Sequence, residues 1–338
     1  MIPGVSVVIC CHNSARLLPE TLAALDAQRF EHPIGFEVIV VDNGSTDRTA
    51  EVARAAWPVE KASLRVVREE RLGLSHARFR GIREARHEIV SFIDDDNRVC
   101  DSWVQRVANL MARHPRVGAC GGWNRPAFDG ELPSWFEVAS YSYAVGRQGA
   151  CAGDVTDSRG YLWGAGLSLR KAALTQLIRD GFVSRLRDRQ GRELNSGGDT
   201  EICFALRLAG WRLWYDPDLQ LHHYLPASRL SWSYARRLNA GFGRASVHLD
   251  PYEMALGPKV PDVRRSWAWR TAATLKQLLK YGWMFPLSRF RSMEGDPKAL
   301  AIDQAAARLR ELLRARRDYG LAVTEVARAP WRATRIDS

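Results

Sequence analysis

The sequence predicts an α/β fold with a doubly wound, mostly parallel sheet flanked by helices and followed by a C-terminal helical extension. Two observations lead to this fold class. Short apolar runs typical of buried strands alternate with amphipathic helical patterns over the first 93 residues. The links between these runs are short, and strands joined by helices through short links form parallel sheets with crossover connections.

Local patterns place the elements of the first half. A proline near the start of the first helical pattern fits a first turn, where its missing N–H group costs nothing. A run of Ser and Thr after the second strand is expected to cap the next helix. The expected strands are residues 5–11, 36–41, 64–67 and 89–93, and the expected helices begin near Pro19, in the Ser45/Thr46 region and at residue 75.

The second half is less regular. A stretch rich in Gly and aromatic residues is too long for a simple link, and its aromatic content argues against disorder. We expect a helix at 102–113, a strand at 117–122, the irregular stretch at 123–161, a strand around Leu167 and Leu169, helices from Lys171 and over 201–209, and short strands at 213–215 and 219–223.

Composition limits the possible function. The 338 residues carry a net charge of +11 and a pI of about 9.7, which favours anionic partners. The six cysteines show no metal-site spacing, and their use favours a reducing compartment. The sequence shows neither a signal peptide nor an apolar stretch long enough to span a bilayer. We therefore expect a cytoplasmic protein, or one that lies on the inner face of a membrane.

Three consecutive carboxylates, Asp94, Asp95 and Asp96, follow the predicted strand at 89–93. Ligands of open α/β sheets bind beyond the carboxyl ends of the strands. A divalent cation that also contacts substrate phosphates would offset the mutual repulsion of these acids. A solvated acidic turn is the alternative, because short Asp clusters are also common in turns.

Polar residues end the other strands of the same predicted sheet. His12 and Asp42 follow the first two strands, so they should converge on the aspartates at one edge. No Gly-rich phosphate loop follows the first strand, so a metal and basic side chains would have to neutralise a bound phosphate. The nearest basic candidates in the sequence are Arg71, Arg78 and Arg80.

Taken together, the motifs resemble the family 2 glycosyltransferases, an inverting group with the GT-A fold. The resemblance covers roughly residues 4–245, in the order expected for the family. The segments that carry it are VSVVICCHN, VVDNGSTDRT, GLSHARFRGI, IVSFIDDDN, WGAGLSLRK, GGDTEICFALRLAGWRLWYDP and HHYLPASRLSW. The resemblance implies a GT-A catalytic domain at 1–245, with a nucleotide-sugar-binding half at 1–122, an acceptor-binding half at 123–245, and a basic helical extension at 246–338.

The resemblance also implies roles for single residues. Asp199 matches the expected general base, and Glu201 is a rival because Gly198 replaces the usual glutamate of that motif. From the residues alone, Asp199 could instead cap its helix, and His223 could be a buried core histidine. The implied donor-site residues are His12, Asp42, Arg78, Asp94 and Asp95; the metal ligands are Asp96 and His223; and Trp163 and Gly164 would form the floor of the acceptor pocket.

The implied reaction is a single displacement at the anomeric carbon. It needs a divalent cation (Mn²⁺ or Mg²⁺), a nucleotide-sugar donor, and a glycan or lipid-linked acceptor of polysaccharide or glycolipid synthesis. A UDP-sugar is the first candidate for the donor. A sugar-phosphate nucleotidyltransferase remains an alternative, but the segment HNSARLLPE lacks the Gly-rich activating loop. A non-catalytic nucleic-acid binder is the other alternative. Because no nucleic-acid module is recognisable, we expect no nucleic-acid partner.

The tail concentrates the positive charge. Residues 264–338 contain 16 Lys/Arg and 7 Asp/Glu, a net charge of +9. Apolar residues recur at helical spacing, which predicts either helices packed on the catalytic domain or a helix lying on an anionic membrane. The two expected apolar stripes are Trp267, Thr271, Leu275 and Leu279, with Trp269, Trp283 and Phe285 nearby, and Ile302, Ala306, Leu309 and Leu313.

Overall fold

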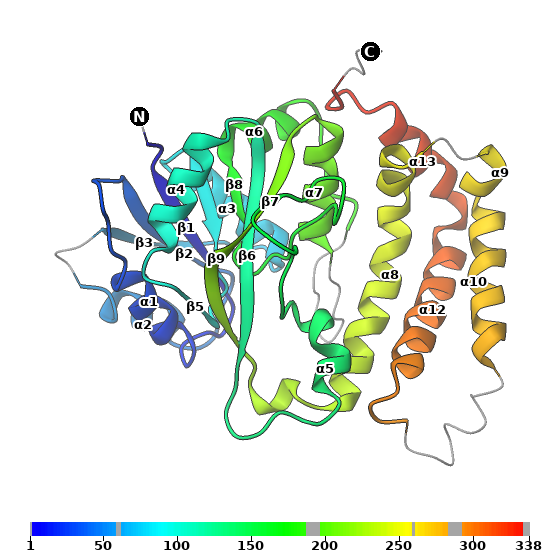
Figure 1. Cartoon of the computed structure of the whole chain (residues 1–338), viewed down its shortest axis with the longest axis horizontal. Helices are drawn as coiled ribbons and strands as arrows, with labels where there is room; N and C mark the ends of the chain where they lie inside the picture. Colours follow the sequence, from blue (N-terminus) through cyan, green and yellow to red (C-terminus); the bar gives the residue numbers. More distant parts are fainter. Residues whose placement is uncertain (1, 59–61, 187–196, 259–260, 283–292, 334–338) are drawn as a thin grey trace.

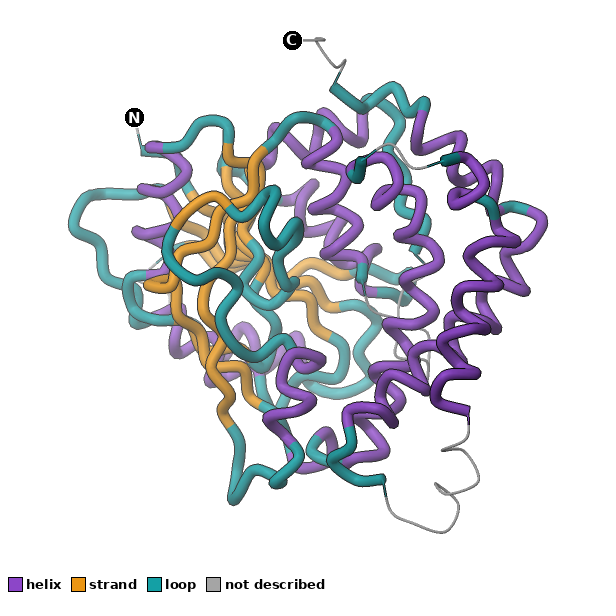
Figure 2. The backbone as a smooth tube through the Cα atoms, turned by 45° about the vertical axis from the view of Figure 1, so that its right-hand side comes forward, coloured by secondary structure: helices purple, strands orange, loops and turns teal. Residues whose placement is uncertain are grey.

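The computed structural model describes residues 2–58, 62–186, 197–258, 261–282 and 293–333. A mixed sheet with helices on both faces forms one side of the molecule, and a bundle of long helices forms the other (Figure 1). Figure 2 shows the same division, with the strands gathered on one side and the long helices on the other. The α/β class and the helical C-terminal region predicted from the sequence are confirmed.

The nine described strands form one sheet in the order β3-β2-β1-β4-β8-β6-β9-β5, with β7 paired to β9. The pairings give β1 to β4, β6 and β9 one direction and β5, β7 and β8 the other, so the sheet is mostly parallel. The strands are β1 Val5–Cys11, β2 Phe36–Asp42, β3 Ser63–Arg68, β4 Ile89–Phe92, β5 Asn97–Val99, β6 Val117–Ala127, β7 Gly153–Asp154, β8 Ser168–Arg170 and β9 Arg212–Tyr224.

Two apolar cores lie on opposite faces of this sheet. Helices α1, α2 and α4 contribute to one core, and α3, α6 and α7 contribute to the other. Strand residues alternate between the cores, so that Val7 and Ile9 face one and Val8 faces the other, as the twofold period of a strand requires. These helices are α1 Leu18–Asp26, α2 Thr49–Ala55, α3 Leu74–Glu84, α4 Trp103–Arg113, α6 Lys171–Arg179 and α7 Gly198–Leu208; the short helix α5 Phe136–Ala139 packs in a separate apolar cluster.

The C-terminal helices are held together by a buried carboxylate. Asp250 on α8 is 1% exposed and accepts hydrogen bonds from Arg308 (2.6 Å) and from the hydroxyl of Tyr319 (2.8 Å). The predicted boundary at residue 245 falls inside α8, which therefore continues from the catalytic part into the extension. The helices are α8 Trp232–Leu256, α9 Asp262–Arg265, α10 Trp267–Gly282, α12 Pro297–Arg314 and α13 Tyr319–Ala327.

The structure corrects several predicted bounds. Strand β6 continues five residues past the predicted end at 122, and the stretch predicted as irregular also contains α5 and β7. The two short strands predicted near the end of the domain are one strand, β9, whose pairing with β6 shifts register between Gly121 and Trp123. Helix α2 begins at Thr49 rather than near Ser45, and the carboxylate of Asp47 accepts the N–H of Thr49 at 3.0 Å.

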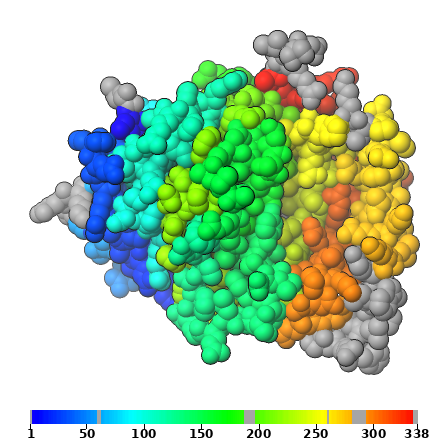
Figure 3. All heavy atoms as spheres, in the orientation of Figure 1, coloured from blue at the N-terminus to red at the C-terminus, as the bar shows by residue number. Residues whose placement is uncertain are grey.

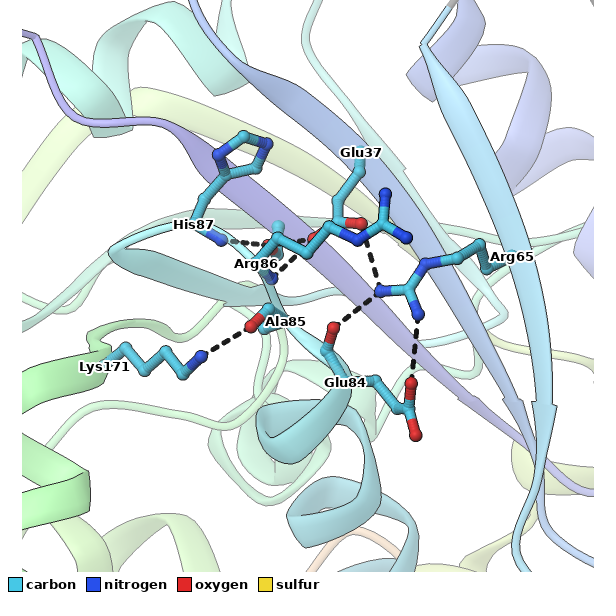
Figure 4. Close-up of polar contacts among 8 residues, drawn as sticks. Glu37, Arg65, Glu84, Ala85, Arg86, His87 and Lys171 are labelled. Carbon is cyan, nitrogen blue, oxygen red and sulfur yellow. Dashed lines mark hydrogen bonds and ion pairs between the residues drawn. The ribbon is translucent and has the colours of Figure 1, made fainter.

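A buried ion-pair network joins the C-terminal end of α3 to β2 and β3 (Figure 4). Glu37 on β2 is 1% exposed; its Oε1 accepts the hydroxyl of Ser6 and the N–H of Arg86, both at 2.7 Å. Its Oε2 accepts Arg65, which also bonds the side chain and the carbonyl of Glu84. Burial alone would raise the pKa of Glu37, but these donors hold the pKa below its ordinary value.

We expect Glu37→Gln to lower the free energy of unfolding at pH 7 by about 2 kcal/mol, because it removes the buried charge of the network and leaves Arg65 paired with Glu84 alone. The folded-state pKa of Glu37 is lowered, so its contribution is present above the unfolded-state pKa and is lost as pH falls through the folded value. The free energy of unfolding, measured in urea at pH 7 and pH 3.5, should therefore differ less between variant and wild type at the lower pH. Glu51→Gln is the control, since its ion pair with Arg48 is exposed.

Candidate active site

The loops after β1 and β2 are bonded to one another. Nδ1 of His12 lies 2.8 Å from the carbonyl oxygen of Asn43, and Asn13 accepts the N–H of Thr46 at 2.8 Å. Asn13 has a φ of 57°, a left-handed conformation that Asn tolerates better than most residues. The His12 ring is exposed and Asp42 is nearly buried at the same edge of the sheet, so the convergence predicted for these two residues is observed.

Asn43 is a structural residue of this edge that the sequence reasoning missed. Its Nδ2 donates to the carbonyls of Glu69 (3.0 Å) and Arg71 (2.7 Å), and its Oδ1 accepts the N–H of Gly73 (2.8 Å). The side chain thereby fixes the loop that leads into α3. Its position directly after Asp42, at the end of a buried strand, was the available signal.

The aspartates after β4 lie beside the end of β1. Burial and the neighbouring charge of Asp96 raise the pKa of Asp95 to about 7. Burial raises the pKa of the Cys11 thiol, and the charge of Asp95 is the next largest cause of this rise. The Asp95 carboxylate therefore lies close to the Cys11 thiol. The backbone carbonyl of Asp95 accepts the hydroxyl of Thr21 on α1 at 2.8 Å, and this bond ties the acidic turn to the first helix.

Asp96 contacts two side chains from the far end of the domain. Its Oδ1 lies 3.6 Å from Nε2 of His223 on β9, and its Oδ2 accepts Arg229 at 2.8 Å. Burial alone would lower the pKa of Arg229, but the charge of Asp96 holds it above the ordinary value. Asp96 also lines a cavity of about 200 Å³ together with Thr21, Asp129 and Tyr224. The sequence reasoning predicted the Asp96–His223 pair but did not include Arg229.

These residues fit a cation that is also held by a substrate. Nε2 of His223 and Oδ1 of Asp96 face each other at 3.6 Å, a separation at which one cation could bind both atoms, while Nδ1 on the other side of the ring is buried without a hydrogen-bond partner in the described part of the chain. Over the same residues, no cluster of three or more His, Cys, Asp or Glu side chains could hold a metal by itself. A cation here would take one carboxylate and one imidazole from the protein and its remaining ligands from donor phosphates and water.

Asp199 lies in the first turn of α7, and its carboxylate faces the backbone at Gly164. Its Oδ2 accepts the N–H of Gly164 at 2.6 Å, and its Oδ1 accepts the N–H of Thr200 at 2.9 Å. A Cβ at Gly164 would come within 2.7 Å of Nη2 of Arg78 and 3.3 Å of Oδ2 of Asp199. The guanidinium of Arg78 also lies 5.6 Å from the ring of Phe92 on β4. Arg78 therefore lies between the acidic strand and Asp199.

Glu201, the rival base, is oriented away from this site. It is fully buried, and its carboxylate accepts the hydroxyl of Ser184, the N–H of Arg185 and the hydroxyl of Tyr252. Because Glu201 is fully buried whereas Asp199 is partly exposed, the Glu201 carboxylate is poorly placed to take a proton from a substrate. The geometry therefore favours a structural role for Glu201, linking α7 to α8.

Aromatic rings surround the other side of Gly164. Trp163 is nearly buried, and its backbone N–H donates to Oε1 of Gln148 at 2.7 Å. Its ring packs edge-on against Tyr141, which is 52% exposed, with centroids 5.4 Å apart. An exposed aromatic face beside a carboxylate is suited to packing against a sugar ring.

The family model described as Glycosyl transferase family 2 matches residues 6–162, which contain β1 to β7 and the acidic turn. This segment, a little under half of the chain, is therefore similar to glycosyl transferase family 2. The alternatives of a nucleotidyltransferase and of a non-catalytic nucleic-acid binder are not supported by this match.

Curated relatives extend this similarity. A glucosyl-dolichyl phosphate glucuronosyltransferase of Haloferax volcanii is 22% identical over 308 residues, 90% of this chain and 91% of that protein. A validoxylamine A glucosyltransferase of Streptomyces hygroscopicus subsp. limoneus is 33% identical over 157 residues, 44% of this chain and 33% of that protein. The second alignment therefore spans about a third of that relative.

Solved structures share the fold of this chain. The mannosyltransferase PcManGT from Pyrobaculum calidifontis, in complex with GDP-Man and Mn²⁺, aligns with 94% of this chain and 87% of its own, with a TM-score of 0.56 and 19% identity. S. aureus TarS 1–349 in complex with UDP-GlcNAc aligns with 94% of this chain and 92% of its own, with a TM-score of 0.52 and 18% identity. The predicted GT-A fold is confirmed by these neighbours.

Proposed function

We propose that this glycosyltransferase uses Mn²⁺ or Mg²⁺ to transfer a sugar from a nucleotide-sugar donor to an acceptor hydroxyl, inverting the anomeric carbon. The acceptor is a glycan or a lipid-linked sugar of cell-surface polysaccharide or glycolipid synthesis. UDP-GlcNAc and GDP-Man in the neighbouring structures support a nucleotide-sugar donor, and a UDP-sugar is the first candidate. A relative named for glucosyl-dolichyl phosphate supports a lipid-linked acceptor.

The observation that carries the proposal is the pairing of Asp96 with His223, whose Nε2 faces the carboxylate at 3.6 Å, at the strand edge that also presents His12 and Asp42. Asp96 and His223 would hold the cation, which when bound stabilises the charge on the leaving diphosphate. His12 would lie beside the base, and Asp42 would accept a hydrogen bond from the base edge. Arg78, with Asp94 and Asp95, would orient the diphosphate and the ribose.

The acceptor would bind on the other side of Gly164, over Trp163. Asp199 would take the proton of the acceptor hydroxyl as the new glycosidic bond forms and the bond to the diphosphate breaks. The backbone N–H of Gly164 fixes the orientation of this carboxylate. A single displacement of this kind inverts the anomeric configuration and requires no covalent enzyme intermediate.

A panel of nucleotide sugars tests the proposal. We expect at least one of UDP-glucose, UDP-GlcNAc, UDP-glucuronate and GDP-mannose to raise the melting temperature in Mn²⁺ or Mg²⁺ but not in EDTA. The same donor should be consumed when the correct acceptor is present. Full donor binding in EDTA, or no binding of any nucleotide sugar with the cation present, would contradict it.

We also propose that the C-terminal helices bring the enzyme to the inner face of an anionic membrane. Among the described helices, none is long and apolar enough to cross a bilayer. Helix α10 lies at the outer side of the bundle (Figures 1 and 3). It exposes Trp269 (39%), Leu275 (46%) and Leu279 (70%). Lys276 is exposed on the same helix, and basic residues near a membrane surface add about 1 kcal/mol each.

The predicted apolar stripes divide in the structure. Trp267 is directed into the bundle, where its Nε1 donates to the carbonyl of Leu312 at 2.6 Å. Ile302 on α12 is buried as well, and Arg308 is bonded to Asp250, so α12 is a packing element, in agreement with the alternative prediction for the tail. The membrane proposal therefore rests on α10 alone. Trp283 and Phe285 lie outside the described residues.

Leu275→Glu/Leu279→Glu should abolish most co-sedimentation with vesicles that contain anionic lipid at low salt, because it removes the exposed apolar surface and two units of net positive charge. Leu313→Glu is the matched control, since Leu313 is 55% exposed but lies on α12. Binding should weaken at high salt and be absent with neutral vesicles. Equal sedimentation of both variants would contradict a membrane role for α10.

A further inference from the structure

The acceptor side of the site contains an arginine surrounded by aromatic rings. The Cζ atom of Arg159 lies 4.5 Å from the ring centroid of Trp163, 4.9 Å from that of Tyr161 and 5.4 Å from that of Tyr141. Its Nε donates to the carbonyl of Tyr161 at 3.1 Å. Its Nη2 is buried and has no hydrogen-bond partner among the residues that the structure describes.

The acids nearest to Arg159 in the sequence are paired with other arginines. Asp154 accepts Arg212 at 2.6 Å, and Asp157 lies within 4.0 Å of both Arg212 and Arg207. No ion pair joins Arg159 to a carboxylate in the described part of the chain. The aromatic rings compensate part of the buried charge through cation–π contacts, but a guanidinium also has in-plane N–H donors that these rings cannot satisfy.

The loop that carries Arg159 is rigid. The N–H groups of Arg159 and Gly160 both donate to the carbonyl of Val155, at 3.1 and 2.9 Å. Gly160 has a φ of 84°, which a residue with a side chain adopts only under strain, and its carbonyl accepts Arg207 at 3.1 Å. The guanidinium is therefore held in place before a substrate arrives, as a binding residue requires.

The same guanidinium lies near the proposed base. Burial lowers the pKa of Arg159, and the charge of Asp199 is among the groups that oppose this effect. Burial raises the pKa of Tyr141, and the charge of Asp199 adds to this rise. Asp199 is thus close enough to both side chains for its charge to act on them, and Trp163, the proposed acceptor floor, packs against the Arg159 guanidinium.

We propose that Arg159 binds an anionic group of the acceptor, a phosphate or a carboxylate, next to the hydroxyl that Asp199 activates. The inference rests on the proposed function and narrows its acceptor to an acidic one. A partly buried cation without a partner is costly, and an oxyanion of the substrate would supply the missing charge-assisted hydrogen bonds. Arginine suits either oxyanion, because its fork of N–H groups matches phosphate and carboxylate alike.

Calorimetric titration of the full chain, saturated with UDP and Mn²⁺, tests the proposal with three small probes. Hexyl phosphate and hexyl β-D-glucuronide carry the two anions, and hexyl β-D-glucoside is the neutral counterpart. We expect one or both anionic probes to bind more tightly than the neutral one, and Arg159→Gln to weaken anionic binding about tenfold or more while leaving the glucoside unchanged. The preferred anion then identifies a phosphate-bearing or a uronate-bearing acceptor.

Two further variants keep the test specific. Arg147→Gln is the matched control, since Arg147 also stacks on an aromatic ring, 4.0 Å from the centroid of Trp123, but not in the Trp163 cluster. Arg159→Lys keeps the charge and should retain part of the anionic binding, and thermal unfolding establishes that each variant is folded.

Equal affinity for charged and neutral probes, an unchanged Arg159→Gln variant, or no binding of either anion would overturn the proposal. Displacement of the anionic probe by UDP and Mn²⁺ would also overturn it, because the probe would then occupy the donor site. The titration is repeated without nucleotide. If UDP fails to bind in any condition while anionic binding still depends on Arg159, the proposed function fails and Arg159 remains an anion-binding residue without an acceptor role.

Discussion

Asp199→Asn should leave donor binding and stability unchanged and lower the rate of sugar transfer by about 10²–10⁴-fold. The Asn side chain keeps the oxygen that accepts the N–H of Gly164, and it remains a good residue for the first turn of a helix. It cannot take a proton from an acceptor hydroxyl. A role limited to helix capping or loop anchoring therefore predicts nearly normal turnover, whereas the general-base role predicts its loss.

The measurement is the initial rate of transfer at saturating donor, together with the melting temperature with and without donor and Mn²⁺. Asp157→Asn is the control, because its carboxylate is largely exposed and pairs with Arg207 and Arg212. Turnover of Asp199→Asn near the wild-type rate would remove Asp199 as the base. Glu201 would not replace it easily, since it is fully buried and bonded to Ser184, Arg185 and Tyr252.

The sequence predicted the parts of the fold that depend on local pattern. The apolar runs that form β1, β2 and β4 are buried on both faces of a parallel sheet, so they need no tertiary information to be recognised. Because such strands end at one edge, the meeting of His12, Asp42 and the acidic turn also followed from the order of the elements. The pairing of His223 with Asp96 was predicted in a different way, from the resemblance of the HHY segment to the family's metal-side histidine.

The rest depended on contacts between segments distant in the sequence. Arg229 reaches Asp96 across 133 residues, and its place in the HHYLPASRLSW segment does not by itself indicate a contact with the acidic turn. Glu201 has a carboxylate that could serve as a general base, but the side chain is directed inward, where it is bonded to Tyr252 of α8. The tail stripe containing Trp267 was divided between buried and exposed residues by the packing of α12, which helical spacing alone does not reveal. In β9, the two short strands expected at 213–215 and 219–223 are one strand, and its register against β6 shifts between residues 215 and 220.

Asp96→Asn should abolish the part of donor affinity that depends on the cation, while the fold persists. The Asn amide keeps the shape of the side chain and an oxygen for Arg229, but it loses the negative charge that a divalent ion requires of this site. We expect donor affinity in Mn²⁺ to fall about 100-fold or more, to the value that the wild type shows in EDTA, because losing one ligand of a two-residue site leaves His223 alone.

Calorimetric titration of the donor with Mn²⁺ and with EDTA measures this, and Asp129→Asn is the control, because Asp129 lines the same cavity but is bonded to Tyr224. If Asp96→Asn keeps cation-dependent affinity, the ligand is another residue of the acidic turn. If both variants lose it equally, the negative charge of the cavity as a whole attracts the cation, and no direct Asp96–metal bond is needed.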